Sequence, residues 1–125
     1  MELRRFVAHN ADTGDSVGIF HALRMVEDCS DFDGEDANAM YETELALDKE
    51  LPVPPYDRWN YARSTAWFTE EGVAFFGDKL SVLAYMVDEY LSWCGYSSKV
   101  LVAEDDYSGD DVLYRDKWQV IVRCA

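Results

Sequence analysis

Positive charge is scarce in this chain. It has 11 Lys and Arg residues against 25 Asp and Glu residues, which gives a formal net charge of -14 at pH 7. A chain with this balance should not bind nucleic acid directly or attach to an anionic membrane, because both surfaces are negatively charged. The expected partner is a basic protein, above all a nucleic-acid-binding effector with a cationic groove. The alternative is a structural or adaptor protein whose acidity serves only solubility.

Cysteine, histidine and catalytic motifs are scarce as well. The three cysteines, Cys29, Cys94 and Cys124, have no regular spacing, so the sequence predicts neither a disulfide framework nor a CxxC zinc site. Free cysteines are typical of proteins in a reducing cytoplasm. The two histidines, His9 and His21, do not lie in a triad or in a metal-ligand spacing. We therefore predict no catalytic residue, no metal site and no cofactor.

Long apolar runs are missing too. The N-terminal residues contain no run long enough for a signal peptide, and no stretch approaches the roughly 18 apolar residues of a membrane span. The chain is nevertheless 49% hydrophobic and 14% aromatic, which is enough to bury a core. With 125 residues, it is expected to form a single domain, 1–125, in the cytoplasm.

The order of the apolar patterns predicts an α+β fold. We expect a small, mostly antiparallel sheet of three to four strands, with three to four helices packed on one face. The expected strands cover 3–9, 62–68, 99–103 and, as a strand or hairpin, 112–123. The expected helices run from a Ser16 cap to about Cys29, over 36–51, from a Thr69 cap to Gly77, and over 80–94.

The last of these helices has an unusually wide apolar face. Its apolar positions are expected to share one side, which Val82, Met86 and Trp93 extend, so this helix should be largely buried. The positions on that side are Leu80, Leu83, Val87, Tyr90, Leu91 and Cys94. Gly95 is expected to end the helix. In the last strand the period of two places Trp118, Val120 and Val122 on one face.

Two segments, 27–42 and 104–111, concentrate the excess acid, and we predict that their carboxylates bind the partner. The residues are Glu27, Asp28, Asp31, Asp33, Glu35, Asp36 and Glu42 in the first segment, and Glu104, Asp105, Asp106, Asp110 and Asp111 in the second. Glu27 and Asp28 fall in the last turn of an expected helix, where the helix dipole disfavours each anion by about 0.3–1 kcal/mol. Helix stability therefore does not explain them. A plain solvated loop is the alternative.

A calcium loop is a further possibility for the first segment. In an EF-hand loop that starts at Asp31, four ligand positions would be acidic, and they are Asp31, Asp33, Glu35 and Glu42. Position 6 requires a glycine for the sharp turn, but it is Asp36, and Gly34 stands at position 4. Because the turn that gathers the ligands is not encoded, we predict no specific metal site, although the sequence leaves open whether a divalent cation binds.

One pattern indicates an enzyme instead. His9 ends the first expected strand, Ser64 and Thr65 lie in a middle strand, and Glu104 follows a later strand. The set resembles ADP-ribosyltransferases, in which such residues position the nicotinamide ribose. The last strand, "KWQVIV", lacks the glutamate that the family pattern would place there. The resemblance implies an enzyme that modifies a host protein, and it stays an alternative.

The C-terminal half carries a second resemblance. The segments "AWFTEEGVAFFGD", "VLVAEDD" and "VLYRDKWQVIV" surround a long helix. Together with the small size, the free cysteines and the strong acidity, they resemble small phage and mobile-element proteins of the anti-CRISPR and antirestriction type. The resemblance implies a nucleic-acid mimic that inhibits a defence effector by occupying its cationic nucleic-acid site.

Overall fold

The computed structural model describes residues 2–52, 64–104 and 112–123. Its strands are β1 (Glu2–Asn10), β2 (Ser16–Gly18), β3 (Ser64–Phe68), β4 (Tyr96–Glu104), β5 (Val112–Arg115) and β6 (Gln119–Arg123). Its helices are α1 (Ile19–Glu27), α2 (Gly34–Glu50) and α4 (Glu70–Leu91), and the short 3-10 helix η1 (Ser92–Cys94) follows α4. The predicted α+β fold is confirmed.

The sheet is built around β1, and each of its strand pairs is antiparallel. Along one edge β4 pairs with the whole of β1, from Glu2 opposite Glu104 to Asn10 opposite Tyr96. The other edge is shared by β2 and β3, and β6 and β5 follow β3. The described sheet has six strands where three to four were expected. The difference arises because β2 forms a hairpin with β1 and because the C-terminal segment divides into β5 and β6.

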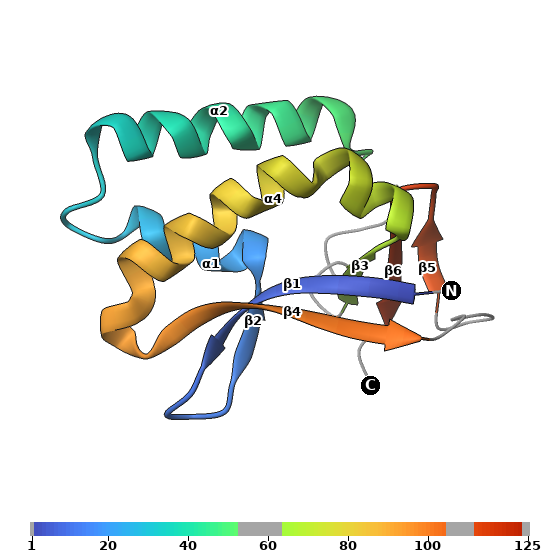
Figure 1. Ribbon diagram of the computed structural model, residues 1–125, viewed down its shortest axis with the longest axis horizontal. Helices are drawn as coiled ribbons and strands as arrows, with labels where there is room; N and C mark the ends of the chain where they lie inside the picture. Colours follow the sequence, from blue (N-terminus) through green and yellow to red (C-terminus); the bar gives the residue numbers. More distant parts are fainter. Residues whose placement is uncertain (1, 53–63, 105–111, 124–125) are drawn as a thin grey trace.

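The helices lie on one side of the long β1–β4 ribbon, as predicted (Figure 1). Helix α4 packs on β1 and β4, α1 packs beside it on β1, and α2 lies against α4. The main core fills the space between these layers and includes Ala8 of β1 and Phe68 of β3. A smaller cluster of Leu3, Val120 and Val122 is separate from it.

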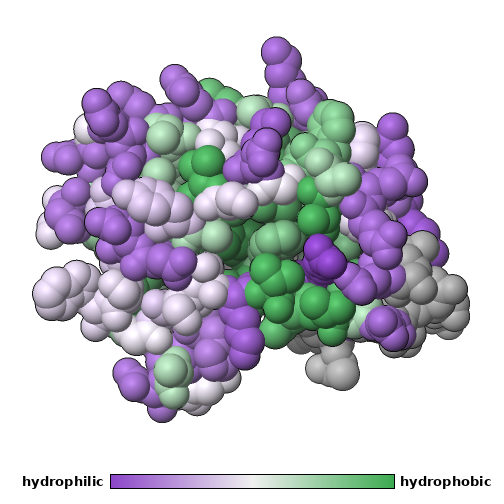
Figure 2. Space-filling model, viewed as in Figure 1, coloured by the Kyte–Doolittle hydropathy of each residue, from purple (hydrophilic) through white to green (hydrophobic). Residues whose placement is uncertain are grey.

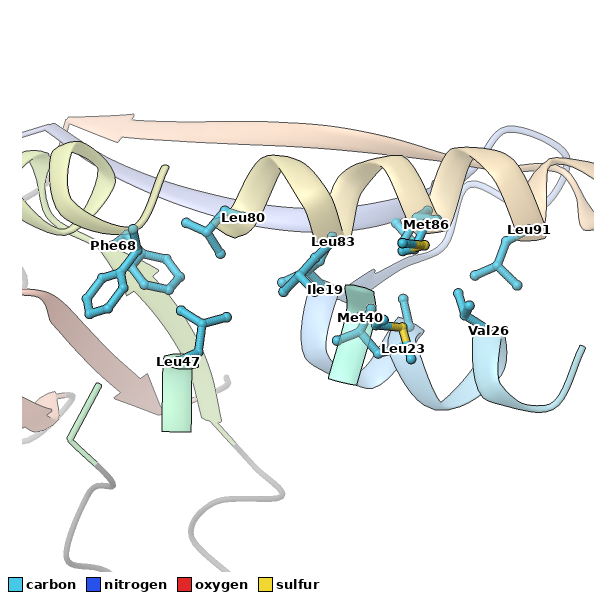
Figure 3. Packing of buried hydrophobic residues seen from close by; sticks show 14 residues of the cluster. Ile19, Leu23, Val26, Met40, Leu47, Phe68, Leu80, Leu83, Met86 and Leu91 are labelled. Atoms are coloured by element: carbon cyan, nitrogen blue, oxygen red, sulfur yellow. The ribbon is translucent and has the colours of Figure 1, made fainter. Parts of the chain in front are cut away.

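Helix α4 supplies much of the core, and its buried face was predicted by its periodicity. The fully buried residues along it are Phe76, Leu80, Leu83, Met86, Val87 and Leu91. Figure 3 shows several of them pointing toward residues of α1, α2 and β3. The expected break at Gly77 is wrong, because one helix continues from Glu70 to Leu91. The Thr69 cap is confirmed, since its hydroxyl accepts a hydrogen bond from the Gly72 N–H at 3.1 Å.

The expectations for Ser16 and Trp118 are both wrong, because each residue lies outside the element in which it was expected. Ser16 does not cap α1, because it begins β2, and the backbone enters the helix at Gly18. Trp118 does not share a face with Val120 and Val122, because it precedes β6 in a turn where Asp116 accepts the Trp118 N–H at 2.7 Å. The Trp118 ring instead stacks on Phe75 of α4, with ring centroids 4.6 Å apart.

Candidate functional site

The loop between α1 and α2 is anchored by one aromatic side chain. Phe32 packs edge-on against Tyr90 of α4 and Tyr41 of α2, with ring centroids 5.0 and 6.3 Å apart. The residues on either side of it, Asp31 and Asp33, are exposed. The loop is therefore held by its partly buried ring, and the two neighbouring carboxylates face solvent.

Most of the predicted acidic residues of the first segment gather at this loop. We call the acidic corner the set Glu27, Asp28, Asp31, Asp33, Glu35 and Asp36, which lies at the end of α1, in the loop and in the first turn of α2. All but Asp36 are exposed, and none forms an ion pair with a described residue. This end of the molecule is mostly hydrophilic (Figure 2). Glu42 is also exposed, two turns further along α2.

Asp36 differs from the rest of the corner because it has a structural partner. Its Oδ2 accepts a hydrogen bond from the hydroxyl of Tyr90 at 2.6 Å, which ties α2 to α4. This hydrogen bond, more than burial or the charge of Asp31, raises the pKa of Tyr90. Substitution of Asp36 would disturb the packing of the two helices as well as the surface charge.

The second acidic segment does not join the corner. Glu104 lies at the end of β4, opposite Glu2, whereas the corner lies near the other end of the sheet (Figure 1). The eight residue steps from Tyr96 to Glu104 span roughly 27 Å in an extended strand. The remaining predicted residues of this segment, Asp105, Asp106, Asp110 and Asp111, lie outside the described residues.

The geometry does not gather the residues of the ADP-ribosyltransferase pattern. His9 pairs with Ser97, and Glu104 pairs with Glu2, so the two side chains stand at opposite ends of β1. Seven residue steps along a strand correspond to roughly 23 Å. In addition, His9 Nδ1 is engaged with the hydroxyl of Ser16 at 2.8 Å. A single active site could not contain both His9 and Glu104.

The calcium positions are also dispersed. Asp31 and Asp33 flank the anchored Phe32, and Glu42 lies well inside α2. Gly34, at position 4 of the hypothetical loop, has a φ of 60° and begins α2. The left-handed turn therefore does not fall at position 6, where an EF-hand loop requires it. Over residues 2–52, 64–104 and 112–123, no three His, Cys, Asp or Glu side chains come together in a way that could hold a metal ion.

Trp93 is a feature of this end of the molecule that the sequence analysis placed wrongly. Its side chain is 92% exposed, and Cys94, which was expected on the same buried face, is exposed as well. The α-helix ends at Leu91 and tightens into η1, and Gly95 then turns the chain with a φ of 88°, so Trp93 rotates away from the buried face. The corner is close by, because Cys94 of η1 contributes, after burial and Asp31, to the raised pKa of Cys29. Gly95 marks the end of the helical segment in the sequence, but it does not indicate that the last turn before it is a 3-10 turn.

A cavity lies on the inner side of α2. It has a volume of about 320 Å³ and is lined by α1, α2, β3 and β6. Its apolar lining includes Leu23, Leu47 and Ile121, and its charged lining includes Glu27 of the corner together with Glu44. Burial, and then the charges of Glu27 and Asp48, raise the pKa of the Glu44 carboxyl. Glu27 was predicted from the sequence as a partner-binding residue, whereas the cavity was not predicted.

A comparison of the chain with known protein families, with curated proteins and with solved structures finds no match. Within the described residues, no helix is both long enough and apolar enough to cross a membrane.

Proposed function

We propose that the protein is a non-enzymatic inhibitor that blocks a basic nucleic-acid-binding surface of a host defence effector in the cytoplasm, in the manner of anti-CRISPR proteins. The observation that supports this proposal is the acidic corner. It presents exposed carboxylates on a loop that is anchored from within by Phe32. An anchored loop keeps its charges in place, so little conformational entropy is lost when a partner binds.

Charge and aromatic surface act together in this proposal. The net charge of -14 steers a cationic surface toward the protein, and the corner lacks ion pairs with described residues that would weaken its field. Trp93 adds a large exposed ring at the same end, and tryptophan is favoured in binding hot spots. The corner thus provides fast, salt-sensitive association, and Trp93 provides apolar contact once the surfaces meet.

The two alternatives differ in what they require. An ADP-ribosyltransferase needs His9 and Glu104 in one site, and their positions on β1 speak against that reading. An adaptor protein whose acidity serves solubility needs no particular arrangement of its charges. It predicts that binding depends on total charge and not on where the charge is placed.

The experiment that separates these readings compares two sets of charge reversals. The corner set is Asp31→Lys, Asp33→Lys and Glu35→Lys, which leaves the hydrogen-bonded Asp36 untouched. The control set is Glu50→Lys, Glu71→Lys and Asp78→Lys, at the end of α2 and in the first half of α4, far from the corner (Figure 1). Both sets change the net charge equally, and each contains one acid from the first turn of a helix.

Immobilised wild-type protein and both variants are used to capture proteins from a host lysate at low salt. The proposal predicts that the wild type and the control set retain a basic nucleic-acid-binding protein, and that the corner set loses it. Retention should fall steeply as the salt concentration rises, because exposed charges are screened over about 10 Å at 0.1 M ionic strength. Equal loss in both variants would favour a role for net charge alone, and salt-independent retention would contradict the proposal.

A further inference from the structure

The cavity beside α2 combines an apolar lining with an excess of negative charge. Leu23 of α1, Leu47 of α2 and Ile121 of β6 belong to its apolar lining. Its volume of about 320 Å³ falls at the lower end of the range typical of small-ligand sites. Such a lining favours a ligand with an aliphatic body over a small hydrated ion.

The charged groups of the cavity come from two helices. Glu27 and Arg24 lie on α1, and Glu44 and Asp48 lie one helical turn apart on α2. Three carboxylates therefore face one guanidinium among the described lining residues, and Arg24 forms no ion pair with any described residue. The cavity has an excess of negative charge that nothing in the described chain neutralises.

Glu44, which lines this cavity, has one carboxylate oxygen that lacks a partner in the described part of the chain. Oε1 of Glu44 is buried and accepts no hydrogen bond from any described residue. Buried acceptors in native proteins are almost always paired, so an orphaned one calls for a specific explanation. Burial and the charges of Glu27 and Asp48 also raise the pKa of Glu44, so a cation bound at its carboxylate would relieve an unfavourable negative charge.

We propose that this cavity binds a primary alkylammonium ion, with the ammonium group at the Glu44 carboxylate, the charges of Glu27 and Asp48 adding to the attraction, and the aliphatic chain along the apolar lining. An ammonium group carries three N–H donors and no acceptor, which matches a site made of carboxylates. A free diamine and the side chain of a lysine in a partner protein both carry this group. The cavity shares Glu27 with the acidic corner but none of the corner's other residues, and the proposal does not rest on the inhibitor function.

The test measures the affinity of two probes by titration calorimetry at neutral pH. The probes are 1,5-diaminopentane and a short lysine peptide with blocked ends. Glu44→Gln keeps the shape of the side chain and removes its charge, and Glu42→Gln is the matched control on the exposed side of the same helix. We expect Glu44→Gln to weaken binding of the tighter probe by at least about tenfold and Glu42→Gln to change it by less than about twofold.

A third variant tests the sign of the charge on the ligand. Arg24→Gln removes the one cation of the described lining, so it should strengthen alkylammonium binding by about two- to fivefold. Tighter binding of the diamine identifies a free amine as the ligand, and tighter binding of the peptide identifies a lysine side chain. The proposal is overturned if neither probe binds below about 10 mM. It is equally overturned if Glu44→Gln has no effect in a variant with unchanged circular dichroism, or if Arg24→Gln weakens binding.

Discussion

Gly72 of α4 lies tightly against the turn before β6, and its replacement by alanine is a stringent test of the fold. A Cβ at this position would lie 2.1 Å from the carbonyl oxygen of Trp118 and 3.2 Å from Cδ1 of Phe68. Neither α4 nor the turn at Trp118 can move easily to make room for this Cβ. The same Trp118 oxygen accepts the Thr69 N–H at 3.0 Å, and the Trp118 ring is stacked on Phe75.

The size of the effect follows from two opposing terms. Overpacking of a tight interior costs about 1–3 kcal/mol, and more where backbone must move. Alanine recovers up to about 1 kcal/mol of helix propensity relative to glycine. We therefore expect Gly72→Ala to lower the free energy of unfolding by about 2 kcal/mol, which for a chain of this length lowers Tm by roughly 8 °C. Gly77→Ala in the same helix is the control, because its Cβ would meet no atom within 4 Å. It should raise stability by about 0.5–1 kcal/mol.

Urea denaturation of both variants, followed by circular dichroism, measures these changes. The two substitutions are chemically identical and lie in one helix, so helix propensity cannot account for a difference in sign. If Gly72→Ala were as stable as Gly77→Ala, the close packing of α4 against the turn at Trp118 would be refuted.

Three further predictions concern single side chains. Asn10→Ala should lower the free energy of unfolding by about 1–3 kcal/mol in urea denaturation, because the buried Asn10 side chain hydrogen-bonds three backbone groups, and an unchanged midpoint would contradict this. Glu44 has a pKa raised above 4.5 in the folded state, so its ionisation removes stability as the pH rises through that folded pKa. Glu44→Gln should therefore stabilise the protein at pH 7 by a few tenths to about 1 kcal/mol and should have little effect near pH 4, and a constant difference would argue against the raised pKa. In a Cys124→Ser background, a thiol reagent should modify the exposed Cys94 well before Cys29, whose pKa is raised by burial and by nearby negative charge.

Local sequence patterns predicted correctly those features of the fold that depend on residues within a single helix. The period of apolar residues predicted the buried face of α4, and Thr69 and Gly95 marked where the chain enters and leaves the helical segment. Gly77 misled the prediction because packing on both sides sustains the helix through a residue of low propensity. The exposure of Trp93 depends on a change from α to 3-10 geometry over a few residues, which periodicity does not encode.

In the candidate site, too, local features were predicted from the sequence, whereas contacts between distant residues were not. The acidic residues of the corner were readable from the sequence because their exposure follows from a short loop between two helices. The link from Tyr90 to Asp36 was not readable, since 54 positions separate the two residues. The cavity was hidden for the same reason: Glu27, Glu44 and Ile121 come from three elements that only the tertiary fold brings together.

Displacement of nucleic acid from a captured basic effector is the most direct test of the proposed function. Labelled nucleic acid is bound to the purified effector, and wild-type protein, the corner set and the control set are titrated against it while fluorescence anisotropy is recorded. The account predicts that the wild type and the control set release the nucleic acid at near-stoichiometric concentrations. It predicts that the corner set, with Asp31, Asp33 and Glu35 reversed, requires at least about tenfold more protein. Equal displacement by all three proteins, or none by the wild type, would contradict it.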